Sequence, residues 1–283
     1  MSLIVLKFGG TSVGSIKKIK NVARIVQKEA KKSKLIVVLS AMAGYTNKMQ
    51  KYLDDIDSKN KIENDLVLTS GENITIGLLS SILKKKKIKT IPLLGWQIPI
   101  ITDNNHQKAK ILNIDNKRIN KFLKKYDVII AAGFQGIDSD GFITSLGRGG
   151  SDTTAVALAA ATKASRCDIY TDVEGVYSTD PNIVPKAKKI NSLAFEEMLE
   201  MSSMGAKVLH TRSVELAMKN NLTLQVLSSL KKKSGTLIVD EKKLIEKEII
   251  SGVSFSKNES KITISGIPDK PGISASIFGL LDS

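Results

Sequence analysis

The sequence predicts an α/β protein with a mainly parallel sheet that helices cover on both faces. Along most of the chain, short apolar runs alternate with longer segments in which apolar residues recur with the period of a helix. The short runs are continuously apolar, which is typical of strands buried on both faces. Strands that alternate with helices require crossover connections, and such connections produce parallel pairing.

Six short apolar runs are expected to be the strands of this sheet: Leu3–Phe8, Leu35–Ala41, Lys89–Leu94, Asp127–Phe134, Cys167–Val173 and Leu222–Ser228. Five segments between or after them have the helical period: Ser15–Lys32, Asp65–Lys85, Asn116–Lys125, Ser151–Ala164 and Leu193–Asn220, the last as two helices joined at Gly205–His210. Gln135–Leu146 differs, because Asp138-Ser139-Asp140-Gly141 between apolar pairs favours a hairpin turn.

The composition is that of an ordinary globular chain. Its 283 residues are 42% hydrophobic and 25% charged, which excludes the disordered and collagen-like classes. A single cysteine, Cys167, excludes an intrachain disulfide and favours the cytoplasm. No uninterrupted apolar run approaches the roughly 20 residues that cross a bilayer, so no membrane partner is expected. The apolar start carries Lys7 and leads to no small-residue cleavage site, which argues against a signal peptide.

The net charge of +15 raises the question of nucleic acid. Only five of the 43 basic residues are arginine, the residue whose planar fork suits base edges and phosphates. The lysines occur in runs such as Lys84–Lys87 and Lys231–Lys233, and the few aromatic residues are not interleaved with them. We therefore interpret the charge as a solvated lysine face and expect no nucleic-acid partner, with a lysine-rich binding protein as the alternative.

The pattern changes near residue 240. Glu241–Glu248 is strongly charged, and two strand-like segments, Ile249–Phe255 and Ser260–Gly266, then precede a helical start at Ile273–Leu281. About 40 residues cannot close a core of their own. We expect a main domain over residues 1–240 and, over residues 241–283, a linker with the first part of a further domain; a tail docked on the main domain is the alternative.

Two turns that follow strands have the composition of phosphate-binding loops. Lys7-Phe8-Gly9-Gly10-Thr11-Ser12 places two glycines and a lysine where a strand ends, so that backbone N–H groups and a full charge can meet an anion. The order of residues is neither that of a P-loop nor that of a dinucleotide fingerprint, and a plain tight turn is the alternative. Ser40-Ala41-Met42-Ala43-Gly44 repeats the arrangement after the second strand, at the edge where parallel sheets bind ligands.

The segment Thr144–Ala155 is the most informative. Ser151 is expected to cap the following helix, and Asp152 suits its first turn. Capping does not explain Gly147-Arg148-Gly149-Gly150, where an arginine stands in a loop almost free of side chains. An arginine fork beside exposed backbone N–H groups forms a receptor for carboxylate or phosphate.

Two later segments carry weaker signals. The carboxylates of Thr171–Pro181 could hold a ribose or a metal, or could cap turns. Lys207, beside Gly205, could contact phosphates or could be simply solvated.

These segments together resemble the aspartate kinase family, a branch of the amino acid kinases. The resemblance rests on Lys7–Val13, Ser40–Gly44, Ser70-Gly71-Glu72, Thr144–Ala155, Thr171–Pro181 and Gly205–His210, which occur in the family's order. It implies a three-layer α/β/α sandwich, the amino-acid kinase fold. It also implies transfer of phosphate from ATP, with Mg²⁺, to the side-chain carboxylate of L-aspartate, on the route to lysine, threonine and methionine.

The resemblance also implies roles for individual residues. Lys7 and Asp152 would be catalytic, with Asp152 organising the phosphates and their Mg²⁺. The residues expected around ATP are Lys7, Phe8, Gly9, Gly10, Thr11, Ser12, Ser40, Thr171, Asp172, Tyr177, Asp180 and Lys207. The residues expected around aspartate are Thr46, Glu72, Arg148, Gly149, Gly150 and Ser151. Glu72 would pair with the substrate ammonium and Arg148 with a carboxylate. A nucleophile that is already a carboxylate needs no general base, so positioning and charge neutralisation would supply catalysis.

The sequence departs from the family pattern in three places. Asn182 stands where arginine is usual, so a cationic contact to the nucleotide is in doubt, and Thr211 replaces a proline without consequence for the chemistry. Residues 250–283 resemble the start of a regulatory ACT module, of which the family carries two, so we expect a homo-oligomer when that region is complete. The alternatives are another kinase of this fold, acting on glutamate, acetylglutamate or a nucleoside monophosphate, and a catalytically weak remnant. Glu72 favours a free amino group over a phosphate.

Overall fold

The computed structural model describes residues 2–206, 208–231, 233–244, 251–254 and 272. Its centre is an eight-stranded sheet in the order β10-β12-β11-β9-β1-β2-β6-β3. All neighbouring strands pair in parallel except β11 and β12. The strands are β1 (Leu3–Phe8), β2 (Lys34–Leu39), β3 (Thr90–Leu93), β6 (Val128–Ala132), β9 (Cys167–Thr171), β10 (Ser192–Ala194), β11 (Leu224–Ser228) and β12 (Thr236–Val239).

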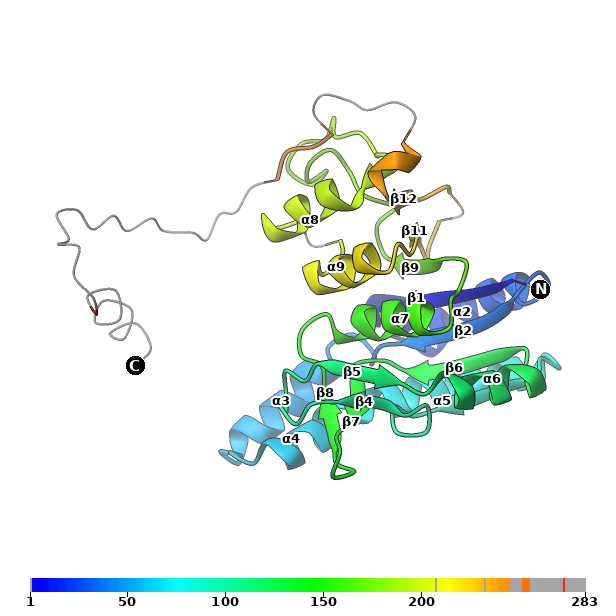
Figure 1. Ribbon diagram of the computed structural model, residues 1–283, viewed down its shortest axis with the longest axis vertical. Helices are drawn as coiled ribbons and strands as arrows, with labels where there is room; N and C mark the ends of the chain where they lie inside the picture. Colours follow the sequence, from blue (N-terminus) through cyan, green and yellow to red (C-terminus); the bar gives the residue numbers. More distant parts are fainter. Residues whose placement is uncertain (1, 207, 232, 245–250, 255–271, 273–283) are drawn as a thin grey trace.

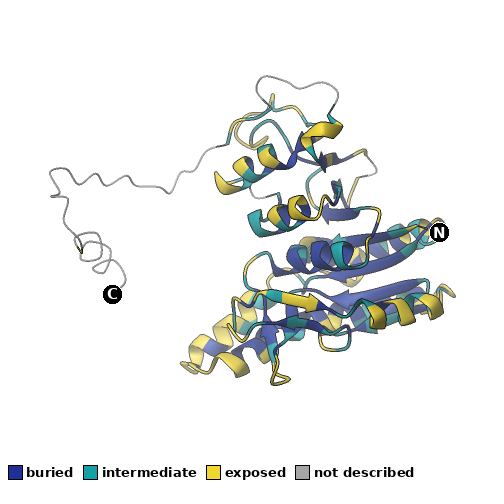
Figure 2. Ribbon diagram, in the orientation of Figure 1, coloured by how far each residue is buried: buried dark blue, intermediate teal, exposed yellow. Residues whose placement is uncertain are grey.

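Helices cover both faces of this sheet, which confirms the three-layer prediction (Figure 1). On one face, α2 (Ile16–Glu29) and α5 (Ser70–Lys85) pack against Ile4, Leu6 and Phe8 of β1. On the other, Val5 belongs to the core that includes residues of four helices. These are α6 (Asn116–Lys125), α7 (Gly150–Ala161), α8 (Phe195–Ser203) and α9 (Thr211–Lys219). The strands are buried on both sides, as their continuous apolar character predicted (Figure 2).

A second, four-stranded sheet lies beside the main one, in the order β5-β4-β7-β8. Its strands are β4 (Ile100–Thr102), β5 (Ile111–Ile114), β7 (Gln135–Ile137) and β8 (Ile143–Ser145). The predicted hairpin is confirmed as β7 and β8, and Asp138 Oδ1 accepts the backbone N–H groups of Asp140 and Phe142 in its turn. β4 and β5 were not predicted, because three or four residues give too short a pattern.

Other elements also differ from the prediction. The helix expected over Asp65–Lys85 is two helices, α4 (Lys61–Leu68) and α5, separated by Thr69, which ends one and precedes the other. The segment Leu193–Asn220 begins with the short strand β10 before α8 and α9. Three further elements were not predicted: β12, α1 (Gly10–Val13) and the largely exposed helix α3 (Tyr45–Asp55).

The start of α7 shows one prediction to be wrong. Ser151 does not cap the helix: the N-cap is Gly149, at φ +72°, and no side chain caps the helix there. Ser151 lies inside the first turn, where its hydroxyl is so close to Gly133 that a Cβ at position 133 would be 2.7 Å from it. Asp152 lies in the first turn, as predicted.

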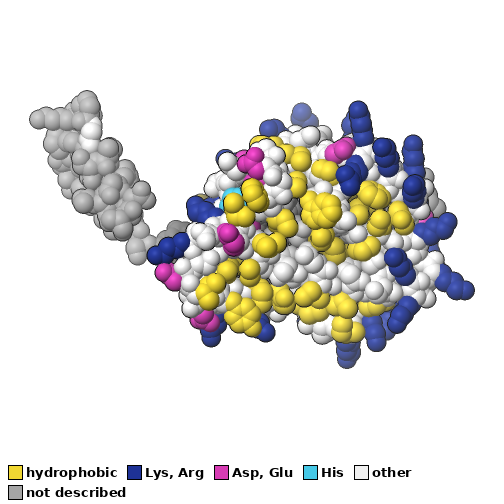
Figure 3. Space-filling model, turned by 90° about the horizontal axis from the view of Figure 1, so that it is seen from below, with side chains coloured by type: hydrophobic (Ala, Val, Ile, Leu, Met, Phe, Trp, Pro, Cys, Tyr) yellow, Lys and Arg dark blue, Asp and Glu magenta, His cyan; other side chains and the backbone are white. Residues whose placement is uncertain are grey.

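On one face of the molecule, basic side chains surround apolar ones. Figure 3 shows lysine and arginine side chains around the margin of one face, with hydrophobic side chains across its centre. Residues 61–85 are long and apolar enough to cross a membrane by length and composition alone. Half of the 18-residue apolar stretch within this segment is buried inside the protein, however, and α5 contributes Ile76, Leu79 and Leu83 to the core. Packing inside the protein therefore accounts for part of its apolar character, although Ile62, Leu66 and Ile74 are exposed.

The expected ACT-like segment lies almost wholly outside the described residues. Residues 251–254, which are described, contact the main domain: the Val253 N–H donates to the Ser178 carbonyl at 2.7 Å, and the Ser251 hydroxyl donates to Glu197 of α8.

Candidate active site

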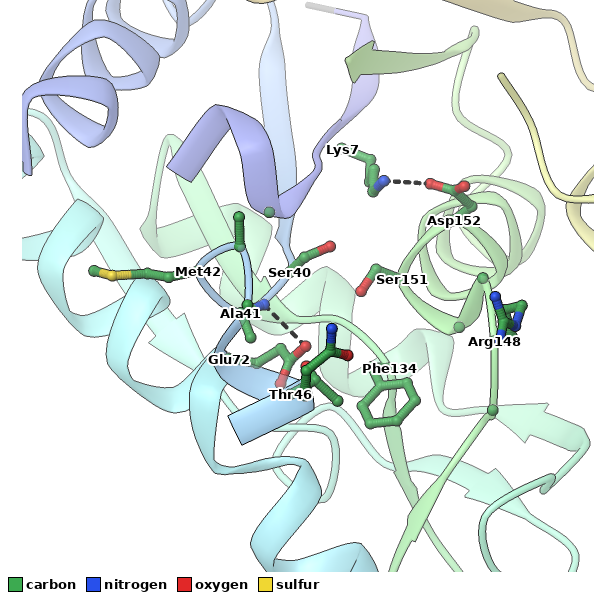
Figure 4. Close-up of a pocket in the computed structure, with 17 residues that line it drawn as sticks. Lys7, Ser40, Ala41, Met42, Thr46, Glu72, Phe134, Arg148, Ser151 and Asp152 are labelled. Carbon is green, nitrogen blue, oxygen red and sulfur yellow. Dashed lines mark hydrogen bonds and ion pairs between the residues drawn. The ribbon is translucent and has the colours of Figure 1, made fainter. Parts of the chain in front are cut away.

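A cavity of about 330 Å³ opens where β1 and β2 end and α7 begins (Figure 4). This is the edge at which parallel α/β sheets bind ligands. Four parts of the chain far apart in the sequence line it. They contribute Lys7 and Gly10; Ser40, Ala41, Met42, Ala43, Gly44, Thr46 and Asn47; Glu72; and Phe134, Gly147, Arg148, Gly149, Gly150, Ser151 and Asp152.

Lys7 and Asp152 form an ion pair at one end of the cavity. The Lys7 ammonium lies 2.6 Å from Asp152 Oδ1, and the two side chains are 12% and 14% exposed. An anionic ligand was expected beside Lys7, but Asp152 of the chain itself supplies the opposite charge. A cation and a carboxylate held together with little solvent form a strong local dipole, since screening by water is weak there.

The turn after β1 is shaped by close approach to the turn after β2. A Cβ at Gly10 would be 2.9 Å from the Ala41 carbonyl oxygen, and the Gly10 carbonyl accepts the Ala43 N–H at 3.2 Å. The Gly9 N–H is already donated, to the Tyr170 carbonyl at 3.3 Å. The Gly9–Gly10 pair is therefore explained in part by packing, and Gly10 alone of the two lines the cavity.

Other residues of the first motif are distributed differently from the prediction. Phe8 is fully buried and stacks on Tyr170, with ring centroids 4.5 Å apart. Ser12 is buried and donates to the Ser229 hydroxyl at 2.8 Å, whereas Thr11 is exposed. None of these three side chains lines the cavity. Ser40, by contrast, lines the cavity together with Lys7.

Glu72 is the buried acid of the site. It is 2% exposed, and its Oε1 accepts the Ala41 N–H at 2.9 Å. Its Oε2 is buried and has no hydrogen-bond partner among the residues that the structure describes. Burial raises the pKa of Glu72 to about 8, against the opposing effect of the Ala41 N–H. An acid with an unpartnered oxygen on a cavity wall is suited to accept a hydrogen bond from a ligand cation.

Arg148 lies on the rim, in the loop between β8 and α7. Gly147 and Gly149 on either side have φ values of +74° and +72°, and a Cβ at Gly149 would overlap the ring of His210. Arg212 supports the loop by donating to the carbonyls of Leu146 and Ala109, both at 2.9 Å. The glycines thus give the backbone its shape, and Arg148 remains exposed at the cavity mouth.

Four further predicted residues, Thr171, Asp172, Tyr177 and Asp180, do not line the cavity. Thr171 ends β9, which pairs with β1, and its hydroxyl donates to Asp172 Oδ1 at 3.0 Å. Tyr177 forms an isolated bridge with Lys189. Asp180 accepts the backbone and side-chain N–H groups of Asn182 at 2.8 and 3.0 Å, which is a turn cap. Lys207 falls outside the described residues.

Several lining residues were not predicted. Ala41, Met42, Ala43, Gly44 and Asn47 line the cavity with the predicted Ser40 and Thr46, and Gly147 precedes Arg148. Ala41 to Gly44 belong to the predicted ligand-binding turn Ser40–Gly44, but only Ser40 of that turn was predicted to contact a ligand. Phe134 belongs to none of the predicted binding motifs. Its backbone is left-handed, with φ +67°, and turns the chain just after β6. Nothing in the sequence indicates that Phe134 lines the cavity.

Comparison with known proteins decides the family. Residues 2–228 match the model of the amino acid kinase family. This chain belongs to that family. It is 51% identical over 282 residues to the aspartate kinase of Pseudomonas putida, covering 99% of this chain and 69% of that protein. The resemblance to aspartate kinases stated from the motifs is therefore confirmed.

Solved structures of family members agree. The aspartate kinase of Synechocystis superposes with a TM-score of 0.75 and is 41% identical, over 84% of this chain and 40% of that one. Aspartokinase III of E. coli, in complex with aspartate and ADP, gives a TM-score of 0.74 at 29% identity, over 84% of this chain and 64% of that one. The chain thus spans only part of the length of these members of the amino acid kinase family.

Proposed function

We propose that this chain is an aspartate kinase, which transfers the terminal phosphoryl group of ATP to the side-chain carboxylate of L-aspartate. One observation carries the proposal: the unpartnered oxygen of Glu72, Arg148 and the Lys7–Asp152 pair face one cavity. Together they match a small molecule with an ammonium and carboxylates next to a phosphate. The aspartate and ADP bound by the E. coli relative support the same pair of ligands.

The acceptor is held by groups of opposite charge. Glu72 Oε2 accepts from the ammonium of aspartate, and the Arg148 fork donates to a carboxylate. Thr46, Ser151 and the backbone of Gly149 and Gly150 complete that side of the cavity. Glu72 favours an acceptor with an ammonium over one with a phosphate there, because an ammonium stabilises the ionised form of Glu72 and a phosphate would oppose it.

The phosphates of ATP lie at the Lys7 end. Lys7 neutralises charge on the transferring group, and Gly10 and Ser40 border the same space. The rest of the nucleotide extends along the carboxyl end of β9, toward Thr171, Asp172, Tyr177 and Asp180. Lys207, which lies outside the described residues, is expected to bind it as well. Asn182 caps the turn at Asp180, so its amide is engaged and does not replace an arginine.

The residues present fit a magnesium ion carried by the nucleotide. In the described part of the chain, no group of three or more His, Cys, Asp or Glu side chains is arranged so that it could hold a metal ion, so no cage of protein groups is found there. Mg²⁺ commonly keeps several waters and binds one or two carboxylates plus phosphates. Asp152, with an oxygen at the cavity, is the carboxylate for this arrangement. When bound, the ion would neutralise phosphate charge.

The reaction needs positioning more than proton transfer. An aspartate side-chain oxygen attacks the terminal phosphorus, the bond from that phosphorus to the bridging oxygen breaks, and ADP leaves with the electron pair. The attacking carboxylate carries no proton to remove, so no general base is required. Lys7 stabilises the charge that develops on the transferring group, and Glu72 with Arg148 sets the approach of the acceptor.

The proposal extends to the domain organisation of the protein. Residues 1–240 form the catalytic domain, and residues 241–283 are a linker and the start of an ACT-like regulatory module. The complete protein acts in the cytoplasm as a homo-oligomer.

The test is aspartate-dependent release of ADP, with the acyl phosphate trapped as its hydroxamate. We expect ADP and hydroxamate in equal amounts with L-aspartate, and neither above background with L-glutamate, acetylglutamate or UMP. Turnover of one of these acceptors instead of aspartate would contradict the proposal. Salt-sensitive nucleic-acid binding without ADP release would favour the lysine-rich binding protein.

A further inference from the structure

A second polar cluster lies outside the cavity, buried between α4 and the small sheet. Its centre is Asp65, whose side chain is completely buried. This carboxylate accepts three hydrogen bonds: from the Ser145 hydroxyl at 2.5 Å, from His106 Nδ1 at 2.8 Å and from the Gln107 N–H at 3.1 Å. One acid on α4 therefore binds both the β4–β5 loop and strand β8.

The other nitrogen of His106 faces a second acid. His106 Nε2 lies 3.6 Å from Asp138 Oδ2, in the turn of the β7–β8 hairpin. Asp138 is 5% exposed and the His106 side chain 10% exposed. The imidazole thus bridges α4 and the hairpin turn. We call Asp65, His106 and Asp138 the acid–histidine bridge.

The bridge is connected to Glu72 through α4. The Asp65 carbonyl accepts the N–H of Thr69 at 3.0 Å and its hydroxyl at 2.8 Å. Thr69 is the residue between α4 and α5, and Glu72 lies in the first turn of α5. Gln135 of β7 donates to the Thr69 carbonyl at 3.3 Å, so the hairpin contacts this junction too.

The bridge is connected to Arg148 through β8. Ser145, which donates to Asp65, ends the strand three residues before Arg148. The Ser145 carbonyl accepts the Ala109 N–H at 3.0 Å, so the loop that carries His106 also pairs with this strand. Gly147 packs against the same loop: a Cβ there would be 2.9 Å from the Gln107 carbonyl oxygen.

We infer that the acid–histidine bridge is a positioning device that fixes the distance between Glu72 and Arg148, and with it the affinity for the amino-acid substrate. The inference rests on the proposed function of those two residues. Burying two carboxylates and an imidazole costs free energy that apolar packing avoids. The polar groups fix the geometry instead, because each hydrogen bond is strong only within a narrow range of distance and angle.

The test compares His106→Leu with His106→Asn, measuring the KM for aspartate and for ATP separately. The asparagine Nδ2 can take the place of Nδ1 as donor to Asp65, whereas leucine leaves that carboxylate short of a partner. We expect the leucine variant to raise the KM for aspartate about tenfold with the KM for ATP within twofold, and asparagine to recover most of the loss. Lys108→Ala, exposed on the same loop, is the control and should match the wild type.

A second measurement separates positioning from general instability. Amide hydrogen exchange at residues 146–150 should quicken in His106→Leu, stay at the wild-type rate in Lys108→Ala, and be largely restored in His106→Asn. Ser145→Ala, which deletes one hydroxyl, should show smaller changes in the same direction and covers the case in which His106→Leu does not fold.

The inference is overturned if His106→Leu leaves the KM for aspartate unchanged, if both KM values rise together, or if asparagine fails to rescue. With a His106→Leu protein that does not fold, Ser145→Ala kinetics equal to wild type overturn it as well. Wild-type turnover of aspartate, measured in the same assay, tests the proposed function independently.

Discussion

The Lys7 ammonium and Asp152 Oδ1 lie 2.6 Å apart, although one belongs to the first strand and the other to the helix that begins at Gly150. Each ends up at the carboxyl edge of the sheet because β1 and α7 pack against one another across its centre. The pair assembles a cation and an acid beside the cavity before any substrate is present. A preorganised charge of this kind contributes most to phosphoryl transfer, since it need not be rearranged during the reaction.

Lys7→Ala should therefore lower kcat by roughly 10²–10³-fold, as expected for the loss of one preorganised charge, with folding retained. Lys34→Ala is the matched control, because Lys34 also pairs with an aspartate, Asp127, at 2.9 Å, but lines no part of the cavity. Steady-state kinetics and circular dichroism would check both variants. A near-normal kcat for Lys7→Ala would remove Lys7 from its role.

Glu72 should make aspartate binding depend on pH. With a pKa of about 8, the acid is mostly protonated in the free protein at pH 6, and the substrate ammonium favours its ionised form. The KM for aspartate should therefore fall as the pH rises from 6 to 8, by up to about tenfold per unit. Glu72→Gln should have a high KM that is flat over this range. Equal pH profiles for the two proteins would argue against the assignment.

The same acid should affect stability with the opposite trend. Its pKa is higher folded than the ordinary value of 4.5, so the fold favours the protonated form. Stability from this group is present below pH 4.5 and declines as the pH rises through about 8. Urea unfolding should show Glu72→Gln gaining stability relative to the wild type between pH 5 and pH 8.5. A constant difference would show that Glu72 does not titrate in this range.

Arg148→Lys should raise the KM for aspartate more than it lowers kcat. Lysine keeps the charge but loses the planar fork that binds a carboxylate through two parallel bonds. Arg118→Lys, at an exposed position on α6, provides the comparison and should leave both constants unchanged. An unaltered KM in Arg148→Lys would count against carboxylate binding at this position.

Gly149→Ala should destabilise the fold more than Gly141→Ala does. Both glycines have a positive φ, +72° and +88°, which costs a side chain about 1–2 kcal/mol. At Gly149 the new Cβ also meets the His210 ring, whereas at Gly141 nothing lies within 4 Å. Urea unfolding of the two variants would isolate the steric part. Equal losses would mean that the α7 loop moves aside without cost.

The sequence predicted the site well where reactive side chains stand in glycine-containing turn motifs. Lys7, Glu72, Arg148 and Asp152 were all identified from motifs, and the cavity brings them together. The prediction for Ser151 was wrong because a hydroxyl at a helix start usually caps the helix, whereas here the N-cap is Gly149, a glycine in the left-handed region.

The acid–histidine bridge was not predictable, since Asp65, His106 and Asp138 share no motif and meet only through tertiary packing. For the same reason, the motifs could not show that Lys7 and Asp152 pair with one another. The short strands β4 and β5 form because they pair with each other and β4 also pairs with β7, and no local sequence pattern indicates this pairing.

The central claim, that an aspartate carboxylate attacks the terminal phosphate in this cavity, can be tested by following oxygen. The chain would be supplied with ATP and with aspartate labelled by ¹⁸O in its side-chain carboxylate, and the product cleaved by hydroxylamine, which attacks the acyl carbon and expels phosphate. We predict that the released phosphate carries one ¹⁸O atom from aspartate. Unlabelled phosphate would show that the attacking oxygen comes from water or from the α-carboxylate, and would contradict the account.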